Sequence, residues 1–224
     1  MKQYFEEWFK THDYYLITFE GPKGSGKTKH AKLFAQWLND QVDYSVLYVA
    51  NPFRATTEAG DIRHKWMSCT NDMDALLYSV LNKHLLQSYL VEYAKKHPRT
   101  IFVVDRWNLS MWVYQVAVPN LMSKRMEYAM WALDFPDQVV PAHQVLLDAP
   151  TETLMQRFSF KEATNRYETP EYISKSVSEY HKYANTCAGK DCMQVVNTAG
   201  GLAPTQSIIR DMFCSKISEH LIGE

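Results

Sequence analysis

The sequence predicts a three-layer α/β fold in which helices flank both faces of a five-stranded parallel sheet. Short apolar runs alternate with longer segments of helical periodicity, as parallel strands joined by crossover helices do. A glycine-rich turn follows the first run and leads into an amphipathic segment. Since the chain has 224 residues, 46% of them hydrophobic, we expect residues 1–224 to form a single domain with a substantial core.

Five apolar runs are expected to be the strands, because each is too short for a helix and several are rich in valine and isoleucine. They are residues 15–20, 45–50, 100–105, 144–148 and 193–197.

Apolar residues at helical spacing predict the core-facing surfaces of three helices. These surfaces are formed by Leu33, Phe34, Trp37 and Leu38, by Met73, Leu76, Leu77, Val80 and Leu81, and by Ile208, Ile209, Met212 and Phe213. Asn71 or Asp72 can cap the second helix, and Pro204 suits the first turn of the third. Residues 157–169 are polar and lack periodicity, which predicts a short mobile lid.

The composition favours a small-molecule partner. Lys plus Arg total 24 against 25 for Asp plus Glu, and a net charge of -1 gives no general attraction to nucleic acid or to an anionic membrane. No apolar run approaches the ~20 residues that cross a bilayer. The four cysteines have no metal-ligand spacing and suit a reducing compartment. We therefore expect a cytoplasmic protein that binds neither a polymeric nucleic acid nor a membrane.

The strongest chemical signal is the segment 21–28, GPKGSGKT, which matches G-x-x-x-x-G-K-[ST] between a predicted strand and a predicted helix. This pattern is the phosphate-binding P-loop, in which glycines let backbone N–H groups turn inward and the next helix adds its positive end. It assigns ATP binding to Gly21, Lys23, Gly24, Ser25, Gly26, Lys27 and Thr28. Lys27 is expected to hold the β- and γ-phosphates, and the Thr28 hydroxyl to ligate Mg²⁺.

Asp105 ends the third apolar run. In an α/β sheet, ligands bind beyond the carboxyl ends of the strands, so Asp105 is expected to reach the magnesium ion or its waters. Its alternative role is to cap the helix that follows.

The rest of the chain favours a small-molecule kinase. A GTPase needs an N-K-x-D motif on a late strand, whereas residues 82–85, NKHL, lack the aspartate and lie in a predicted helix. Phosphoryl transfer between two nucleotides depends on positioning and cationic stabilisation, which requires arginines outside the P-loop. The sequence offers Arg54, Arg106, Arg157 and Arg166 at strand ends and around the predicted lid.

In their order along the chain, these motifs resemble those of the thymidylate kinases, from about residue 15 to the final helix. Residues 51–54, NPFR, are similar to the family's F-P-x-R stretch, and residues 76–79, LLYS, to its L-L-F-S helix. Residues 103–107, VVDRW, with Ser110, Tyr114 and Gln115 downstream, are similar to its V-x-D-R-Y…S-x-x-A-Y-Q pattern, and residues 165–168, NRYE, to the end of its lid. The resemblance implies an ATP- and Mg²⁺-dependent kinase for dTMP, and a homodimer.

The resemblance also implies roles for individual residues. Arg54 and Arg106 would hold the phosphate of the acceptor nucleotide, and Tyr78 would stack on its base. Ser110, Tyr114 and Gln115 would line the nucleoside pocket. The catalytic set would be Lys27, Asp105, Arg106, Arg157 and Arg166, with the lid arginines brought to the transferring phosphate as the lid closes.

Three positions depart from the family's pattern. Lys23 stands where the family commonly has an aspartate that binds the acceptor's 3′-hydroxyl, and Asn82 stands where it has a thymine-reading arginine. Gly24 stands where part of the family has a P-loop arginine, whose charge Arg157, Lys161 and Arg166 would then supply. Since an amide both donates and accepts, Asn82 could read a different base edge, which leaves a modified pyrimidine deoxynucleotide as an alternative acceptor.

Two other functions stay open. A deoxynucleoside kinase of the thymidine kinase type shares the P-loop, the Asp-Arg strand end and an arginine lid. It needs a carboxylate base near the second strand, where Glu58 comes several residues too late. A nucleotide-binding module without turnover would be expected to have lost at least one of Lys27, Thr28 and Asp105.

Overall fold

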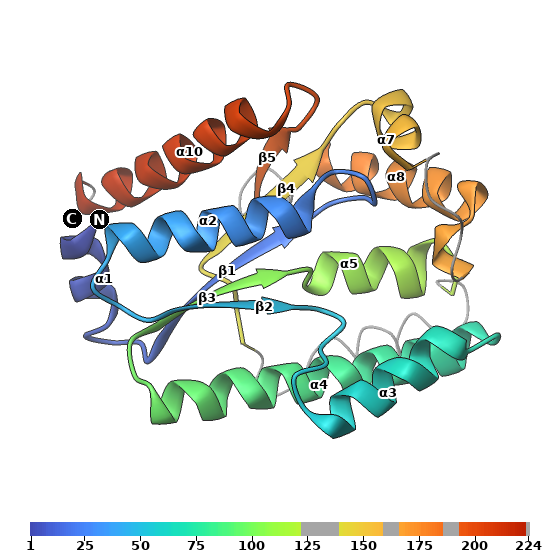
Figure 1. Cartoon of the computed structure of the whole chain (residues 1–224), viewed down its shortest axis with the longest axis horizontal. Helices are drawn as coiled ribbons and strands as arrows, with labels where there is room; N and C mark the ends of the chain where they lie inside the picture. The colour runs from blue at the N-terminus through green and yellow to red at the C-terminus, as the bar shows by residue number, and fades with distance from the viewer. Residues whose placement is uncertain (122–138, 159–165, 186–192, 223–224) are drawn as a thin grey trace.

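The computed structural model describes residues 1–121, 139–158, 166–185 and 193–222, except the side chains of Arg166 and of residues 220–222. Its five strands are all parallel, in the order β2-β3-β1-β4-β5 (Figure 1). They are β1 (Tyr14–Glu20), β2 (Val46–Ala50), β3 (Thr100–Asp105), β4 (His143–Asp148) and β5 (Met193–Asn197). Every predicted strand is confirmed, with its ends within about one residue. The inner strands β1, β3 and β4 are largely buried on both faces, which is why they are apolar runs in the sequence.

The helices alternate with the strands along the chain. They are α1 (Lys2–Trp8), α2 (Lys27–Gln41), α3 (Thr57–Ser68), α4 (Asp72–Lys96), α5 (Asn108–Trp112) with the π-helical turn η1 (Val113–Ala117), α7 (Thr151–Phe158), the 3-10 turn η2 (Arg166–Glu168), α8 (Pro170–Ala184) and α10 (Leu202–Ile222). None of the described helices is long and apolar enough to span a membrane.

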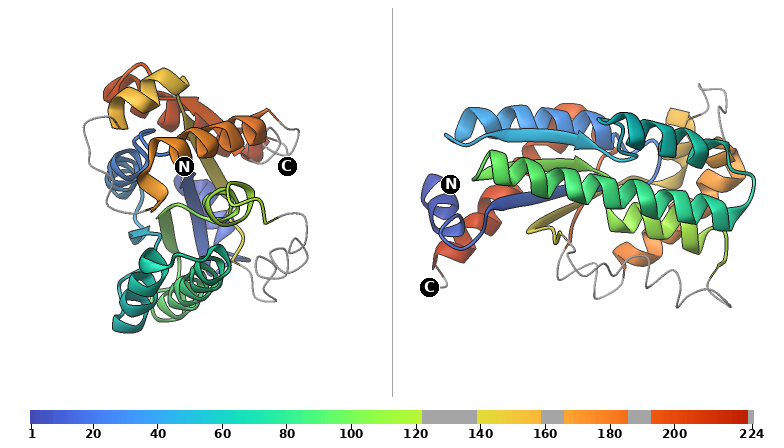
Figure 2. Two further views of the ribbon diagram at one scale, coloured as in Figure 1. Left: turned by 90° about the vertical axis from the view of Figure 1, so that its right-hand side faces the viewer. Right: turned by 90° about the horizontal axis from the view of Figure 1, so that it is seen from below.

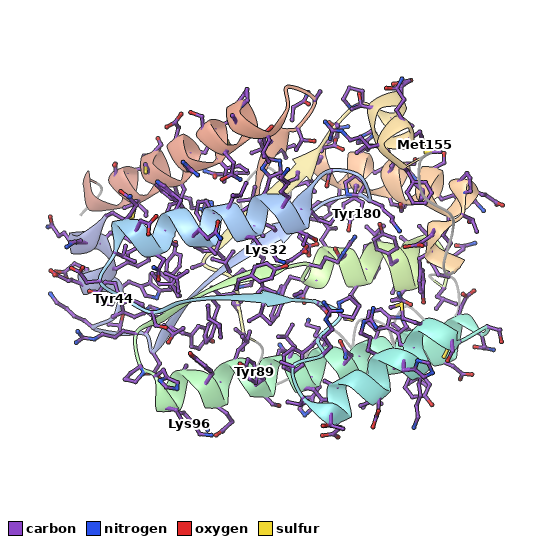
Figure 3. All side chains as sticks on the ribbon, viewed as in Figure 1. Lys32, Tyr44, Tyr89, Lys96, Met155 and Tyr180 are labelled. Carbon is purple, nitrogen blue, oxygen red and sulfur yellow. The ribbon has the colours of Figure 1, made fainter. Side chains whose placement is uncertain are left out.

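The sheet lies between two helical layers (Figure 2). Helices α1, α2 and α10 pack on the face that receives Tyr15, Ile17 and Phe19 of β1. Helices α3 and α4 pack on the opposite face, where Leu16 of β1 is buried. Tyr89 of α4, labelled in Figure 3, is partly buried against this cluster, and its ring centroid lies 5.0 Å from that of Phe53. Because all five strands are parallel, their carboxyl ends lie at one edge of the sheet.

The predicted helix caps are confirmed, and the predicted core surfaces are confirmed in part. Asn71 caps α4 by accepting hydrogen bonds from the amides of Met73 and Asp74, and Pro204 lies in the first turn of α10. Three residues assigned to the core are exposed instead: Leu77, Leu81 and Ile208 are 38%, 47% and 44% exposed. Leu77 and Leu81 each follow a buried residue by one position, Ile208 precedes the buried Ile209 by one, and one position turns a helical side chain by about 100°.

The aromatic N-terminal segment belongs to the core. Helix α1 buries Tyr4 and Phe5, and Phe9 follows it into the same cluster. Phe5 packs edge-on against Tyr15 of β1 with ring centroids 5.1 Å apart. The segment therefore closes the end of the sheet opposite the carboxyl edge of the strands.

His143 at the start of β4 is expected to make the fold acid-sensitive. It is buried edge-on against Phe213, and burial lowers its pKa from 6.5 to about 3. Between these values the unfolded chain binds a proton that the folded chain does not. The stability contributed by neutral His143 is therefore complete above about pH 6.5 and is lost as the pH falls toward 3.

We therefore expect wild-type protein to lose stability more steeply than His143→Leu as the pH is lowered from about 6.5, by up to about 1.4 kcal/mol per pH unit. Urea unfolding at a series of pH values measures this difference. Parallel curves for the two proteins would contradict it, and His12→Gln, at an exposed histidine, is the matched control.

Candidate active site

The P-loop, residues 21–28, joins the carboxyl end of β1 to α2. Gly21, Gly24 and Gly26 all have positive φ, and a Cβ on Gly21 would lie 2.0 Å from the Leu147 carbonyl oxygen. The loop conformation therefore requires glycine, as its sequence pattern predicts. Gly26 caps α2 without any side-chain hydrogen bond, which leaves the first-turn N–H groups of the helix available to an anion.

Lys27 is the first residue of α2 and is buried. Its ammonium group donates to the Pro22 carbonyl oxygen at 2.6 Å and lies 3.4 Å from Ser25 Oγ. Burial lowers the pKa of Lys27, and the neighbouring positive charge of Arg106 lowers it further. A phosphate anion bound at this loop would raise the pKa of Lys27 again, because a nearby negative charge favours the ammonium form.

Thr28 and Asp105 lie side by side. The Thr28 hydroxyl donates to Asp105 Oδ2 at 2.5 Å, and Tyr48 approaches the same oxygen at 3.4 Å. The other carboxylate oxygen, Oδ1, is buried and has no hydrogen-bond partner among the described residues. The alternative role of Asp105 as a helix cap is not observed, because α5 has no side-chain cap. A hydroxyl beside a carboxylate with an unused buried oxygen fits a magnesium ion that also binds nucleotide phosphates.

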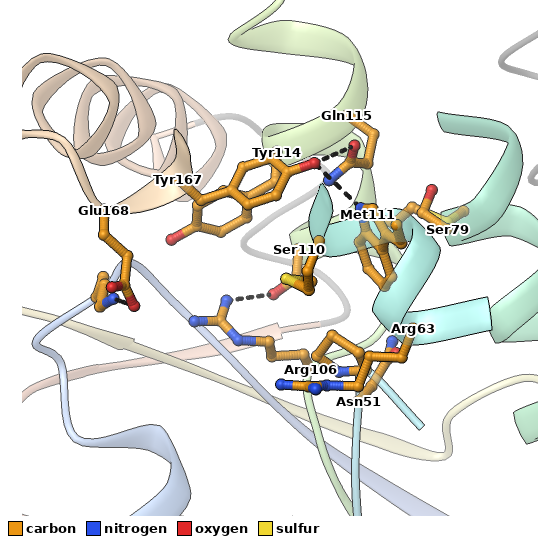
Figure 4. Close-up of a pocket in the computed structure, with 14 residues that line it drawn as sticks. Asn51, Arg63, Ser79, Arg106, Ser110, Met111, Tyr114, Gln115, Tyr167 and Glu168 are labelled. Carbon is orange, nitrogen blue, oxygen red and sulfur yellow. Dashed lines mark hydrogen bonds and ion pairs between the residues drawn. The ribbon is translucent and has the colours of Figure 1, made fainter. Parts of the chain in front are cut away.

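A cavity of about 230 Å³ opens beside the P-loop (Figure 4). It is lined by Lys23, Asn51, Pro52, Arg63, Trp66, Met67, Ser79, Arg106, Ser110, Met111, Tyr114, Gln115, Tyr167 and Glu168. We call this space the acceptor cavity. Its lining combines aromatic rings with three cationic side chains, as a nucleoside carrying a phosphate requires.

One part of the acceptor cavity is aromatic and uncharged. Trp66 Nε1 donates to the Tyr167 hydroxyl at 3.1 Å, which lies 3.3 Å from Gln115 Oε1. The Tyr167 ring in turn packs edge-on against Tyr114 with centroids 6.3 Å apart. These contacts hold aromatic rings and an amide group in place, and such a lining suits the planar base of a nucleotide.

The charged part of the acceptor cavity contains Lys23, Arg63 and Arg106. Arg106 Nη1 donates to Ser110 Oγ at 3.2 Å, and its guanidinium lies over the Tyr114 ring at 5.2 Å. Lys23 forms an ion pair with Glu168 and lies 5.0 Å from the centroid of the Phe158 ring. Lys23 therefore joins the P-loop to the end of the lid segment.

The structure brings five predicted site residues to the acceptor cavity: Lys23, Arg106, Ser110, Tyr114 and Gln115. Arg54 is exposed on the loop after β2 and does not line the cavity, so its phosphate contact stays a prediction.

The assignment of Asn82 to base reading is corrected. Its side chain is fully buried, where it accepts from the Phe53 amide and donates to the carbonyl oxygens of Phe53 and Ala59. These hydrogen bonds hold the loop after β2 and the start of α3 against α4.

Tyr78 also differs from its prediction. It packs with Trp66 and Tyr167 behind the cavity rather than lining it. Trp66 and Arg63 do line it, from positions three residues apart on α3. Their i,i+3 spacing places them on one helix face. Nothing in the sequence indicated that this face borders a site.

Trp66 is therefore expected to contribute more to acceptor binding than Tyr78. Trp66→Ala should raise the KM for the acceptor by about 10- to 100-fold, since aromatic stacking on a base is worth about 1–3 kcal/mol. Tyr78→Ala is the matched comparison, because it truncates a ring in the same cluster. Steady-state kinetics would contradict this assignment if Tyr78→Ala had the larger effect.

The predicted lid is described only at its two ends. Helix α7 continues to Phe158, which is buried, so the predicted start of the lid at residue 157 lies within a helix. Arg157 donates to the Gly24 carbonyl oxygen at 3.2 Å and to the Thr198 carbonyl oxygen at 2.8 Å. It thus lies against the P-loop and the loop after β5, away from the acceptor cavity. Lys161 and the Arg166 side chain lie outside the described part of the chain.

Comparison with known proteins identifies similar sequences and folds. A sequence model of the family described as thymidylate kinase matches residues 19–207. A probable thymidylate kinase of Methanococcus vannielii is 30% identical over 179 residues, covering 78% of this chain and 80% of that protein. A thymidylate kinase of Bartonella quintana is 31% identical over 170 residues, covering 72% and 74%. The thymidylate kinase structure from Candida albicans superposes with a TM-score of 0.68 at 17% identity, covering 92% and 93%, which indicates a shared fold.

Proposed function

Because the chain belongs to the thymidylate kinase family, we propose that it transfers the γ-phosphoryl group of ATP to the phosphate of dTMP, giving ADP and dTDP. The observation that carries this proposal is the position of Arg106 relative to the P-loop. Arg106 follows β3 and Gly21 follows β1, and the Arg106 amide donates to the Phe19 carbonyl oxygen at 2.9 Å. Two neighbouring strands therefore present two anion-binding groups at the same edge of the sheet.

The residues of the site would act by binding and orienting the two nucleotides. The P-loop and Lys27 hold the phosphates of ATP, and Arg106 holds the phosphate that attacks. A phosphate acceptor is already ionised and needs no base, so catalysis consists of alignment and stabilisation of charge. Thr28 and Asp105 would hold Mg²⁺, which when bound offsets the charge of the phosphate oxygens.

The charges around the acceptor cavity favour a nucleotide over a nucleoside. Among the described residues that line it, the one carboxylate is Glu168, which is ion-paired with Lys23. Glu58 is exposed on α3 and does not line the cavity. A nucleoside 5′-hydroxyl would need a carboxylate free to accept its proton.

The decisive experiment offers purified protein, ATP and Mg²⁺ with either dTMP or thymidine, and measures ADP and the phosphorylated product. We expect dTDP from dTMP and no dTMP from thymidine. Thymidine phosphorylation, or ATP turnover independent of any acceptor, would contradict the proposal. Deoxynucleotides with other pyrimidine bases complete the panel, because Lys23 and Asn82 replace family residues that contact the sugar and base. A cytoplasmic location and a homodimer remain part of this proposal.

A further inference from the structure

Glu20 is a buried acid that the proposed reaction does not use. It is the last residue of β1, the central strand, and it directly precedes the P-loop. Its side chain is 0% exposed. A carboxylate removed from water must be matched by donors and positive charge, so its partners indicate its role.

Two residues after β3 supply the donors. The Trp107 amide donates to Glu20 Oε1 at 2.8 Å, and the Ser110 amide lies 3.2 Å from both carboxylate oxygens. The Ser110 hydroxyl donates to Oε2. Both amides lie at the start of α5, which has no side-chain cap of its own. Glu20 therefore fixes the turn between β3 and α5 from a different strand.

That turn contains Arg106, whose backbone needs support on both sides. Its φ of 75° lies in the left-handed region, which side-chain-bearing residues seldom adopt. The Arg106 amide donates to the Phe19 carbonyl oxygen, and the next amide, that of Trp107, donates to Glu20. The last two residues of β1 thus hold Arg106 in this conformation.

A second connection joins the carboxylate to the guanidinium. Ser110 Oγ has one hydrogen, which it donates to Glu20, so it accepts from Arg106 Nη1 at 3.2 Å and from the Tyr180 hydroxyl at 2.8 Å. In Glu20→Gln, the side-chain NH₂ group would face groups that now donate to the carboxylate of Glu20. The direction of the Ser110 hydroxyl would change, and Arg106 would lose its fixed partner.

From these contacts we propose that Glu20 is a positioning residue for the acceptor: it fixes the turn and the Ser110 hydroxyl that aim Arg106 into the acceptor cavity. The inference rests on the proposed function. It concerns the acceptor rather than ATP, because the hydrogen bonds of Glu20 lead to Arg106. The hydrogen bonds of Lys27 are made instead to Pro22 and Ser25.

A double-mutant cycle tests this inference in the full chain, with wild type, Glu20→Gln, Arg106→Ala and the double variant. We expect Glu20→Gln to lower kcat/KM for dTMP by about 30-fold or more while the KM for ATP stays within about threefold. In the Arg106→Ala background, the same change should alter kcat/KM by less than about threefold, because residues that act through one another are not additive. An undiminished effect in that background would overturn the inference.

Ile17→Val is the matched control, since Ile17 is 0% exposed in the same strand and faces the opposite layer. It should lower Tm and leave kcat/KM for dTMP unchanged. If Glu20→Gln does not fold by circular dichroism, Ser110→Ala replaces it in the cycle with the same criteria. A wild-type protein inactive toward every nucleoside monophosphate overturns the proposed function and this inference together. An active wild type with an additive cycle overturns this inference alone.

Discussion

Replacing Arg106 with alanine is expected to lower kcat/KM for dTMP by about 10²- to 10³-fold, as loss of one preorganised hydrogen-bond donor does in other active sites. The guanidinium lines the acceptor cavity, where Ser110 and the Tyr114 ring hold it in place. Kinetics with each substrate varied in turn should place the loss on the acceptor and leave the KM for ATP within about threefold. Arg106→Lys should recover only part of the activity, because an ammonium lacks the planar geometry that binds two phosphate oxygens.

Arg63 and Arg54 provide the comparison for Arg106. Arg63 lines the acceptor cavity, whereas Arg54 is exposed outside it. We therefore expect Arg63→Ala to raise the KM for dTMP by about tenfold, the value of one charge-assisted contact, and Arg54→Ala to raise it less. If Arg54→Ala raised the KM for dTMP more than Arg63→Ala, the exposed Arg54 and not the cavity-lining Arg63 would contact the acceptor phosphate.

The sheet and the P-loop could be predicted from the sequence because both depend on local signals. A strand buried on both faces is a short apolar run whatever surrounds it, and the P-loop glycines are required by backbone angles within the loop itself. Asp105 and Arg106 could be placed for a related reason. Since they follow directly after a buried strand, the sheet itself brings them to the edge where the P-loop lies.

The walls of the acceptor cavity could not be predicted in the same way, because they depend on how α3 and α4 pack. Tyr78 and Asn82 lie on α4 with the expected spacing, yet α3 packs against α4 and places Trp66 and Arg63 at the cavity instead. Asn82 is then needed to hold the loop that leads into α3. Helix packing of this kind leaves no local pattern, so the sequence could not show which side chains of α3 and α4 line the cavity.

Glu168 illustrates a contact between distant parts of the chain. From the sequence, Lys23 was only a cation at the position where the family commonly has an aspartate. That change left no carboxylate to bind the 3′-hydroxyl of the acceptor's sugar. The structure pairs Lys23 with Glu168, 145 residues away, so a carboxylate is present at the same wall of the cavity. Nothing in either local segment specifies this pairing.

Replacing Lys27 with alanine is expected to lower kcat by about 10³-fold or more, a larger effect on kcat than that of Arg106→Ala. The ammonium group is buried at the start of α2 beside the P-loop carbonyl of Pro22, where low solvent exposure strengthens its attraction for phosphate oxygens. Lys29→Ala is the matched control, because Lys29 is exposed on the same helical turn. Its kcat should equal that of wild type. Calorimetric binding of dTMP should be preserved in both variants, since Lys27 does not line the acceptor cavity. If Lys27→Ala kept wild-type turnover, Lys27 would not stabilise the transferring phosphoryl group, and its assignment to the catalytic set would be wrong.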